Sequence, residues 1–149
     1  MGRLPDKLIE LLGANRKAPV NISDLVPKWD GAEEYTSVEA IYRDLLGNEC
    51  WITRYTWEEH IPKELEKKGY KQFLNVSREK LREILEQPEI IVYDWDKDAF
   101  LYGSRFEGLL LFVVVGKDSR KIFTLIPRKN IFKNTRRFEV IYEKDHSSL

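Results

Sequence analysis

Cysteine, histidine and long apolar runs are all scarce in this chain. The single cysteine, Cys50, cannot form an internal disulfide, so we expect a reducing compartment and a cytoplasmic protein. The longest apolar run, Leu109 to Val115, is far shorter than the roughly 20 residues that a membrane-spanning helix needs. Residues 1–12 are charged and their apolar run is too short for a signal peptide. We therefore expect no membrane partner.

Motifs for metal and cofactor chemistry are also missing. Cys50, His60 and His146 show no CxxC or HxxxH spacing, which argues against structural zinc. The chain has no Walker A loop, no GxSxG nucleophile elbow and no dinucleotide-binding glycine fingerprint. We expect no metal and no other cofactor, so any chemistry must come from ordinary polar side chains.

Overall charge is balanced, but its distribution is not. The chain has 25 Lys and Arg against 25 Asp and Glu, which excludes a polycation that coats nucleic acid through net charge alone. Residues 101–149 hold ten basic and five acidic side chains, and the first hundred residues have the opposite excess. Two interpretations stay open: an anion-binding face, or attraction between two halves of one fold.

Hydrophobic periodicity predicts helices in the first part of the chain. Two capping-box patterns, at 36–39 and 56–59, and an N-cap at Ser77 mark helix starts. Pro62 predicts an irregular start for the helix that contains it, and Pro88 ends the last helix. The predicted helices span residues 4–12, 36–47, 56–68 and 77–87, and residues 49–54 are predicted to be extended.

After Pro88 the residues become β-branched and aromatic, which favours strands. We expect Leu109–Val115 to be buried on both faces and Pro127 to end the strand before it. Short connections require antiparallel pairing. The sequence therefore predicts an α+β fold, with N-terminal helices followed by a four- to five-stranded antiparallel β-meander, its strands at 90–95, 100–102, 109–115, 121–126 and 138–142.

The predicted organisation has three parts. Residues 1–50 form a helical and loop extension packed on the same domain, and residues 51–143 form the α+β domain. The last part, residues 144–149, is expected to be a disordered tail.

His60 is the first candidate for chemistry. It follows Glu58 and Glu59 near the start of a predicted helix, and histidine acts as a general acid or base near neutral pH. The alternative, and the more frequent case, is an ordinary histidine on an amphipathic helix.

The basic segment 117–137 is the second candidate. Its cations can neutralise phosphates, and its phenylalanines can either stack on unpaired bases or belong to the core. Alternatively, lysines on an exposed strand edge serve only to prevent aggregation. The predicted nucleic-acid-binding residues are Lys117, Arg120, Lys121, Lys129, Lys133, Arg136 and Arg137.

Three further residues are candidates for contact with a phosphate. Thr124 and Arg128 lie at and just beyond the end of an apolar strand, where a hydroxyl and a guanidinium can hold a scissile phosphate. Arg105 follows Gly103 closely and points either into a cleft or into solvent. For Thr124 the alternative is an ordinary β-favouring residue.

Six short motifs follow one another from Trp51 to Tyr142, and their order resembles the BECR (barnase/EndoU/colicin/RelE-type) ribonuclease superfamily, especially its phage and mobile-element versions. The motifs are Ile52-Thr53-Arg54, Thr56-Trp57-Glu58-Glu59-His60-Ile61, the run from Leu81 to Ile91 with its Pro88, Phe100-Leu101-Tyr102, Leu111-Phe112-Val113-Val114-Val115 and Phe123-Thr124-Leu125-Ile126-Pro127.

This resemblance implies helices followed by a four-stranded antiparallel sheet, and metal-independent cleavage of RNA. His60 matches the family's early histidine and Thr124 its late threonine. In an active endoribonuclease of this type, a ribose 2′-hydroxyl would attack the adjacent phosphate. His60 would act as general acid or base, while Arg105 and Arg128 would stabilise the phosphorane.

Two functions stay open, beside the third alternative of a small domain without a ligand. One is a metal-independent ribonuclease-like or RNA-binding domain. The other is a non-catalytic protein-interaction module of the antitoxin, immunity or phage-accessory type, with residues 1–50 binding a protein partner. The zero net charge and the lack of a second histidine close behind His60 favour the second function. What separates them is whether one cleft gathers His60, Arg105, Thr124 and Arg128.

Overall fold

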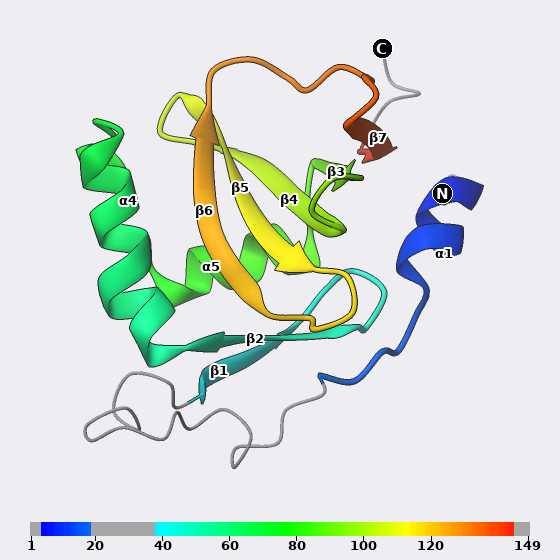
Figure 1. Ribbon diagram of the computed structural model, residues 1–149, viewed down its shortest axis with the longest axis horizontal. Helices are drawn as coiled ribbons and strands as arrows, with labels where there is room; N and C mark the ends of the chain where they lie inside the picture. Colours follow the sequence, from blue (N-terminus) through cyan, green and yellow to red (C-terminus); the bar gives the residue numbers. More distant parts are fainter. Residues whose placement is uncertain (1–3, 19–37, 145–149) are drawn as a thin grey trace.

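A five-stranded antiparallel sheet, with helices against one of its faces, makes up the main body of the protein (Figure 1). The computed structural model describes residues 4–18 and 38–144. The elements are α1 (Asp6–Leu12), β1 (Val38–Arg43), β2 (Glu49–Thr53), η1 (Thr56–His60), α4 (Ile61–Lys67), η2 (Lys71–Phe73), α5 (Arg78–Glu86), β3 (Ile90–Asp94), β4 (Ala99–Phe106), β5 (Leu109–Gly116), β6 (Ile122–Arg128) and β7 (Phe138–Glu143). The predicted α+β class is confirmed.

The large sheet has the strand order β6-β5-β4-β3-β7. Strands β3 to β6 follow one another as a meander, whereas β7 pairs with β3 at the opposite edge. The connection from β6 to β7, residues 129–137, therefore spans the width of the sheet, and its Phe132 packs on one face. We call this connection the arch (Figure 1).

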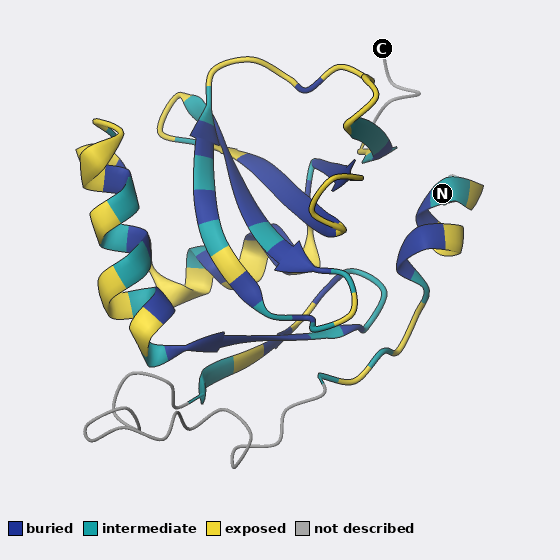
Figure 2. Ribbon diagram, in the orientation of Figure 1, coloured by how far each residue is buried: buried dark blue, intermediate teal, exposed yellow. Residues whose placement is uncertain are grey.

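The two faces of the sheet carry different layers. On the helix face, Phe100, Tyr102 and Leu111 belong to the main core together with apolar residues of α1, α4 and α5. On the other face, which we call the arch face, Leu101 and Phe112 belong to a smaller cluster that includes Phe132 of the arch. Figure 2 shows the arch as exposed along most of its length, and its buried segment is Phe132.

The helix predicted over 36–47 is wrong. Within it, residues 38–43 form β1, which pairs with β2 in a two-stranded sheet. Ile41 is 54% exposed and Tyr42 only 5%. Neighbouring residues of a strand point to opposite faces, whereas the predicted helix would have placed both side chains on one buried face. The hairpin is stabilised by its turn, in which Asp44 accepts hydrogen bonds from the backbone of Leu46 and Asn48.

The next helices agree with the prediction more closely. The helix through Pro62 starts as a π-helical turn, η1, before α4 begins, so its irregular start is confirmed. The capping box over 56–59 is wrong, because Thr53 instead accepts from the backbone N–H of Thr56 (3.2 Å). Ser77 caps α5 as predicted, accepting from the backbone of Lys80.

Strand β6 departs from the expected pattern in two ways. A register shift between Val114 and Val115 leaves Phe123 out of the ladder and 44% exposed, whereas Ile122 and Leu125 are both buried. Pro127 does not end the strand but pairs with Leu111 inside it. Proline is tolerated there because β6 is an edge strand, where a missing N–H costs no ladder bond.

Several predictions fall wholly or partly on residues outside the described ranges. They are the loop predicted over 14–35, of which 19–35 lie outside, the cap residues Thr36 and Ser37, and all but the first residue of the tail predicted over 144–149. The division predicted at residue 50 falls within β2. Within residues 4–18 and 38–144, no helix is long and apolar enough to cross a membrane.

Gly103 allows the arch face to be built. It pairs with Phe112 across β4 and β5, and a Cβ atom on Gly103 would overlap the Phe112 ring. The Phe112 and Phe132 rings pack edge-on with their centroids 5.0 Å apart, and the centroids of Phe132 and Phe138 are 4.7 Å apart. A glycine in β4 therefore positions the ring that fastens the arch to the sheet.

We expect Gly103→Ala to lower the free energy of unfolding by about 1–3 kcal/mol, because the new methyl group displaces the Phe112 ring. Urea denaturation followed by circular dichroism measures this loss. In a double-mutant cycle with Phe112→Leu, the double variant should lose less unfolding free energy than the two single variants lose in sum. Strict additivity would show that the ring and the glycine are independent.

A buried polar network connects the remaining parts of the molecule. The Arg120 guanidinium, 1% exposed, forms an ion pair with Asp44 (3.1 Å) and donates to the Tyr102 hydroxyl (3.2 Å) and the Glu49 carbonyl (2.9 Å). Tyr102 donates to Asp44 as well (2.7 Å). The turn between β5 and β6, the β1–β2 hairpin and β4 thus meet at one side chain.

The surroundings of this network are dry. Burial raises the pKa of Tyr102 well above its ordinary value, and it raises the pKa of the neighbouring Cys50 thiol to about 12. Cys50 is therefore a protonated core thiol at neutral pH rather than a nucleophile.

Arg120→Met should destabilise the protein by about 3–5 kcal/mol, because it leaves the Asp44 carboxylate buried without its cation. Arg82→Met, which breaks an exposed pair with Glu79, serves as the control and should cost less than about 1 kcal/mol. Urea denaturation of both variants measures the difference. If both variants lose the same unfolding free energy, the Arg120 ion pair does not stabilise the fold more than an exposed pair does.

Candidate nucleic-acid interface

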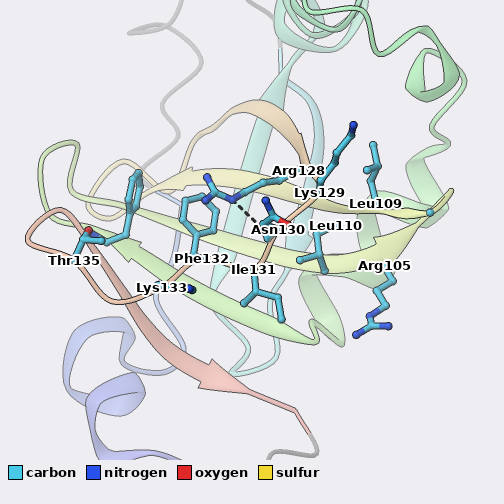
Figure 3. Close-up of a pocket in the computed structure, with 12 residues that line it drawn as sticks. Arg105, Leu109, Leu110, Arg128, Lys129, Asn130, Ile131, Phe132, Lys133 and Thr135 are labelled. Carbon is cyan, nitrogen blue, oxygen red and sulfur yellow. Dashed lines mark hydrogen bonds between the residues drawn. The ribbon is translucent and has the colours of Figure 1, made fainter.

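A wide cavity of about 1170 Å³ opens between the sheet and the arch (Figure 3). Its lining combines the turn between β4 and β5, the end of β6 and the arch. Four of the lining side chains are cations, and none of the lining residues is acidic. We call it the cation cavity, and its cations are Arg105, Arg128, Lys129 and Lys133.

Strand register explains why Arg105 and Arg128 share this cavity. Leu110 of β5 pairs with Arg105 of β4 on one side and with Arg128 of β6 on the other. Side chains that are directly opposite one another project from the same face of a sheet. Residues 23 positions apart in the sequence therefore lie in one row on the arch face.

Arg128 is held in place by an aromatic ring. Its Cζ lies 3.8 Å from the centre of the Phe132 ring, and its Nε donates to the Asn130 carbonyl (2.9 Å), the contact drawn as a dashed line in Figure 3. Cation–π stacking of this kind leaves the remaining N–H groups of the guanidinium directed outward.

The four cations have no carboxylate partner within 4.0 Å among the described residues. Arg105, Lys129 and Lys133 are exposed, and Arg128 is half-buried. The Glu89 carboxylate accepts from the Arg105 backbone N–H, but among the described residues no carboxylate pairs with the four side-chain charges. The arrangement therefore suits a ligand that carries several negative charges.

A second, smaller pocket of about 490 Å³ adjoins the first, and Arg128, Phe132 and Phe138 line both. We call it the apolar pocket. Thr124 lines it, on the same face as Arg128. Thus Arg128 shares one hollow with Arg105 and the other with Thr124.

Arg137 fixes the end of the arch. Its guanidinium forms two hydrogen bonds of 3.0 Å to the Asp94 carboxylate. Burial by itself would raise the pKa of Asp94, but the bonds from Arg137 and from the backbone of Lys97 and Asp96 outweigh it and lower that pKa. The hydrogen bond to Asp94 likewise raises the pKa of Arg137. The first role of Arg137 is therefore structural, because it ties the end of the arch to Asp94 of β3.

His60 does not share either hollow. It ends η1, and α4 begins beside it with Ile61, which belongs to the main core on the helix face. Thr124 pairs instead with Val114, which packs against the cluster on the arch face. The ribonuclease mechanism requires these four candidates in one cleft, but the sheet separates His60 from Arg105, Thr124 and Arg128.

Three residues predicted to bind nucleic acid lie at the other end of the sheet. Arg120 is buried in the ion pair with Asp44, so its assignment to a nucleic-acid surface is wrong. Lys121 lies 5.7 Å from the Trp51 ring centre, and burial lowers its pKa. Lys117, half-buried, lies over Tyr93 at 5.8 Å.

The predicted nucleic-acid-binding residues of the arch other than Arg137 are all exposed. Lys129 and Lys133 line the cation cavity, and Arg136 is exposed but lines neither hollow. Sequence reasoning missed Lys97 and Ile131, which line the apolar pocket and the cation cavity respectively. Lys97 lies in the turn between β3 and β4, and Ile131 lies in the arch, so no strand pattern in the sequence indicates either residue.

No metal-binding group emerges from the described residues, since no three of their His, Cys, Asp and Glu side chains are gathered closely enough to hold an ion. His146 lies outside the described ranges. The chain matches no family model, no curated protein and no solved structure.

Proposed function

We propose that this protein binds RNA on the arch face of its sheet. The observation that carries the proposal is the set of four cations around one cavity without a carboxylate partner among the described residues. Arginine and lysine side chains neutralise phosphates, and an arginine stacked on an aromatic ring adds a flat surface for a base.

The charge arrangement favours a polyanion over a single small anion. The cavity is wide and open, so its cations are spread along a surface rather than directed at one point. Each phosphate neutralised releases condensed counterions, which makes the affinity depend steeply on salt.

Binding without cleavage fits the position of His60. A general base has to lie within hydrogen-bonding reach of the proton that it removes. His60 lies on the helix side of the sheet, whereas the cations line the arch face. The position of His60 favours a non-catalytic module over an active ribonuclease, and the cations of the cation cavity favour RNA over a protein as its partner. We therefore propose a non-catalytic RNA-binding domain, of the BECR type that the motif order resembles.

Replacing two cavity lysines should weaken RNA binding and reduce its salt dependence. For Lys129→Ala/Lys133→Ala, we expect the slope of log K against log salt to fall by about 0.7 per lysine, the value for single-stranded nucleic acid. Fluorescence anisotropy of a short labelled RNA over a series of salt concentrations measures this slope.

The matched control is Lys63→Ala/Lys67→Ala, which removes two exposed lysines from α4 at the helix side. This control should bind RNA with the wild-type slope. If both double variants lose affinity equally, binding depends on net charge and the cation cavity is not the site.

His60→Ala should leave RNA affinity at the wild-type value, because His60 lines neither hollow. Incubation of the wild type and this variant with total RNA and with tRNA in EDTA tests the catalytic alternative. We expect no cleavage that depends on His60. Metal-free cleavage that disappears in the variant would restore the ribonuclease mechanism.

A further inference from the structure

The apolar pocket has a shape and a wall chemistry that differ from those of the cation cavity beside it. Its sheet side consists of Leu101, Val114 and Ile126, which come from β4, β5 and β6. Phe132 of the arch and Phe138 of β7 contribute aromatic rings on the other side. A hollow of about 490 Å³ with such walls lies in the range of roughly 300–1,000 Å³ that small-molecule sites occupy.

The apolar pocket is also lined by cationic side chains. Lys97, Arg128 and Arg137 line it together with the carboxylate of Asp94, which Arg137 already occupies. Apolar walls next to uncompensated positive charge suit a flat, weakly polar group that is covalently attached to an anion. A nucleotide has this composition, with a base joined through ribose to phosphate.

Arg128 connects the two hollows. Its side chain lines both, and stacking on Phe132 fixes its guanidinium at their boundary. A phosphate held by Arg128 would therefore have the remaining cations of the cation cavity on one side and the apolar pocket on the other.

We propose that the apolar pocket receives one unpaired base of a single-stranded RNA, with the phosphate next to that base on Arg128. This proposal rests on the proposed function and specifies its ligand. Base-paired RNA cannot supply such a base without unstacking and unpairing it, which costs free energy. The protein should therefore prefer single strands to duplexes.

Thr124 takes a different role in this arrangement from the one that its motif suggested. Thr124 lines the apolar pocket, and its hydroxyl donates to the Leu125 carbonyl over 3.4 Å, a long contact on its own strand. The hydroxyl oxygen therefore keeps its acceptor capacity for the edge of an inserted base. Thr124 is a specificity residue rather than a phosphate ligand.

The test compares three RNAs of equal phosphate number: a single strand with all bases, the same strand with abasic positions, and a duplex. We expect the base-bearing strand to bind roughly tenfold more tightly than the abasic strand, in line with base–aromatic stacking. A 2-aminopurine base in the single strand should also change its fluorescence on binding, because it enters an apolar environment.

Thr124→Phe fills the apolar pocket and should abolish both the base-dependent gain and the 2-aminopurine signal, while binding of the abasic strand stays at the wild-type level. Thr124→Val keeps the shape and removes the hydroxyl, so it should retain the gain but alter the preference among bases. Should Thr124→Phe fail to fold, Val114→Leu narrows the same pocket from β5.

The outcomes separate the two proposals. Equal affinity for base-bearing and abasic strands overturns the base pocket alone, as does a gain that survives pocket filling. Failure of the abasic strand to bind, or binding that ignores Lys129 and Lys133, counts against the cation cavity itself. Tight binding of the duplex at the level of the single strand also overturns the base pocket.

Discussion

The buried ion pair between Arg120 and Asp44 is the contact on which the arrangement of the layers depends. Both side chains are almost fully enclosed, and their partners come from the β1–β2 hairpin, from β4 and from the turn after β5. The backbone adds to the junction, because Trp51 donates to the Arg120 carbonyl (3.0 Å) and its ring N–H to the Ser119 carbonyl (2.8 Å). Charges removed from water have to be paired, and the Nε and Nη2 groups of Arg120 find their acceptors only when these segments meet in this way.

The N-terminal segment is fastened to the same junction. Asn48 donates to the Gly13 carbonyl (2.8 Å) and accepts from the backbone of Arg16, while its amide also meets Asp44. The end of α1 and the β1–β2 turn are thus placed together by side-chain amide and carboxylate groups. That end of the sheet is occupied by structural contacts, and the cation cavity lies at the other end, where β4 turns into β5 and β6 leads into the arch.

The uneven charge of the sequence has two physical meanings in the folded protein. Arg120 and Arg137 pair with Asp44 and Asp94, so basic residues of the second part neutralise acidic residues of the first. Arg105, Arg128, Lys129 and Lys133 line the cation cavity without such pairs among the described residues. Attraction between the halves and an anion-binding face were alternative interpretations of one asymmetry, and they do not exclude each other because they concern different residues.

Local signals in the sequence determined much of the secondary structure. Ser77 and Pro88 bound α5, and β-branched runs mark β3 and β5, because capping and backbone restriction act over a few residues. The α+β class follows from their order. Local signals failed for residues 38–43. Their apolar spacing fits a helix, but they form a strand because they pair with β2, and a local pattern does not show such pairing.

What only the tertiary structure decided is which side chains share a space. Register places Arg105 and Arg128 opposite Leu110, the bulge at Phe123 changes which residues of β6 are buried, and the return of β7 to β3 carries the arch over the sheet. None of these is visible in a residue's own neighbours along the chain. The same limit explains His60 and Arg120, whose types suggested function and whose positions on the helix side and in the core depend on contacts distant in sequence.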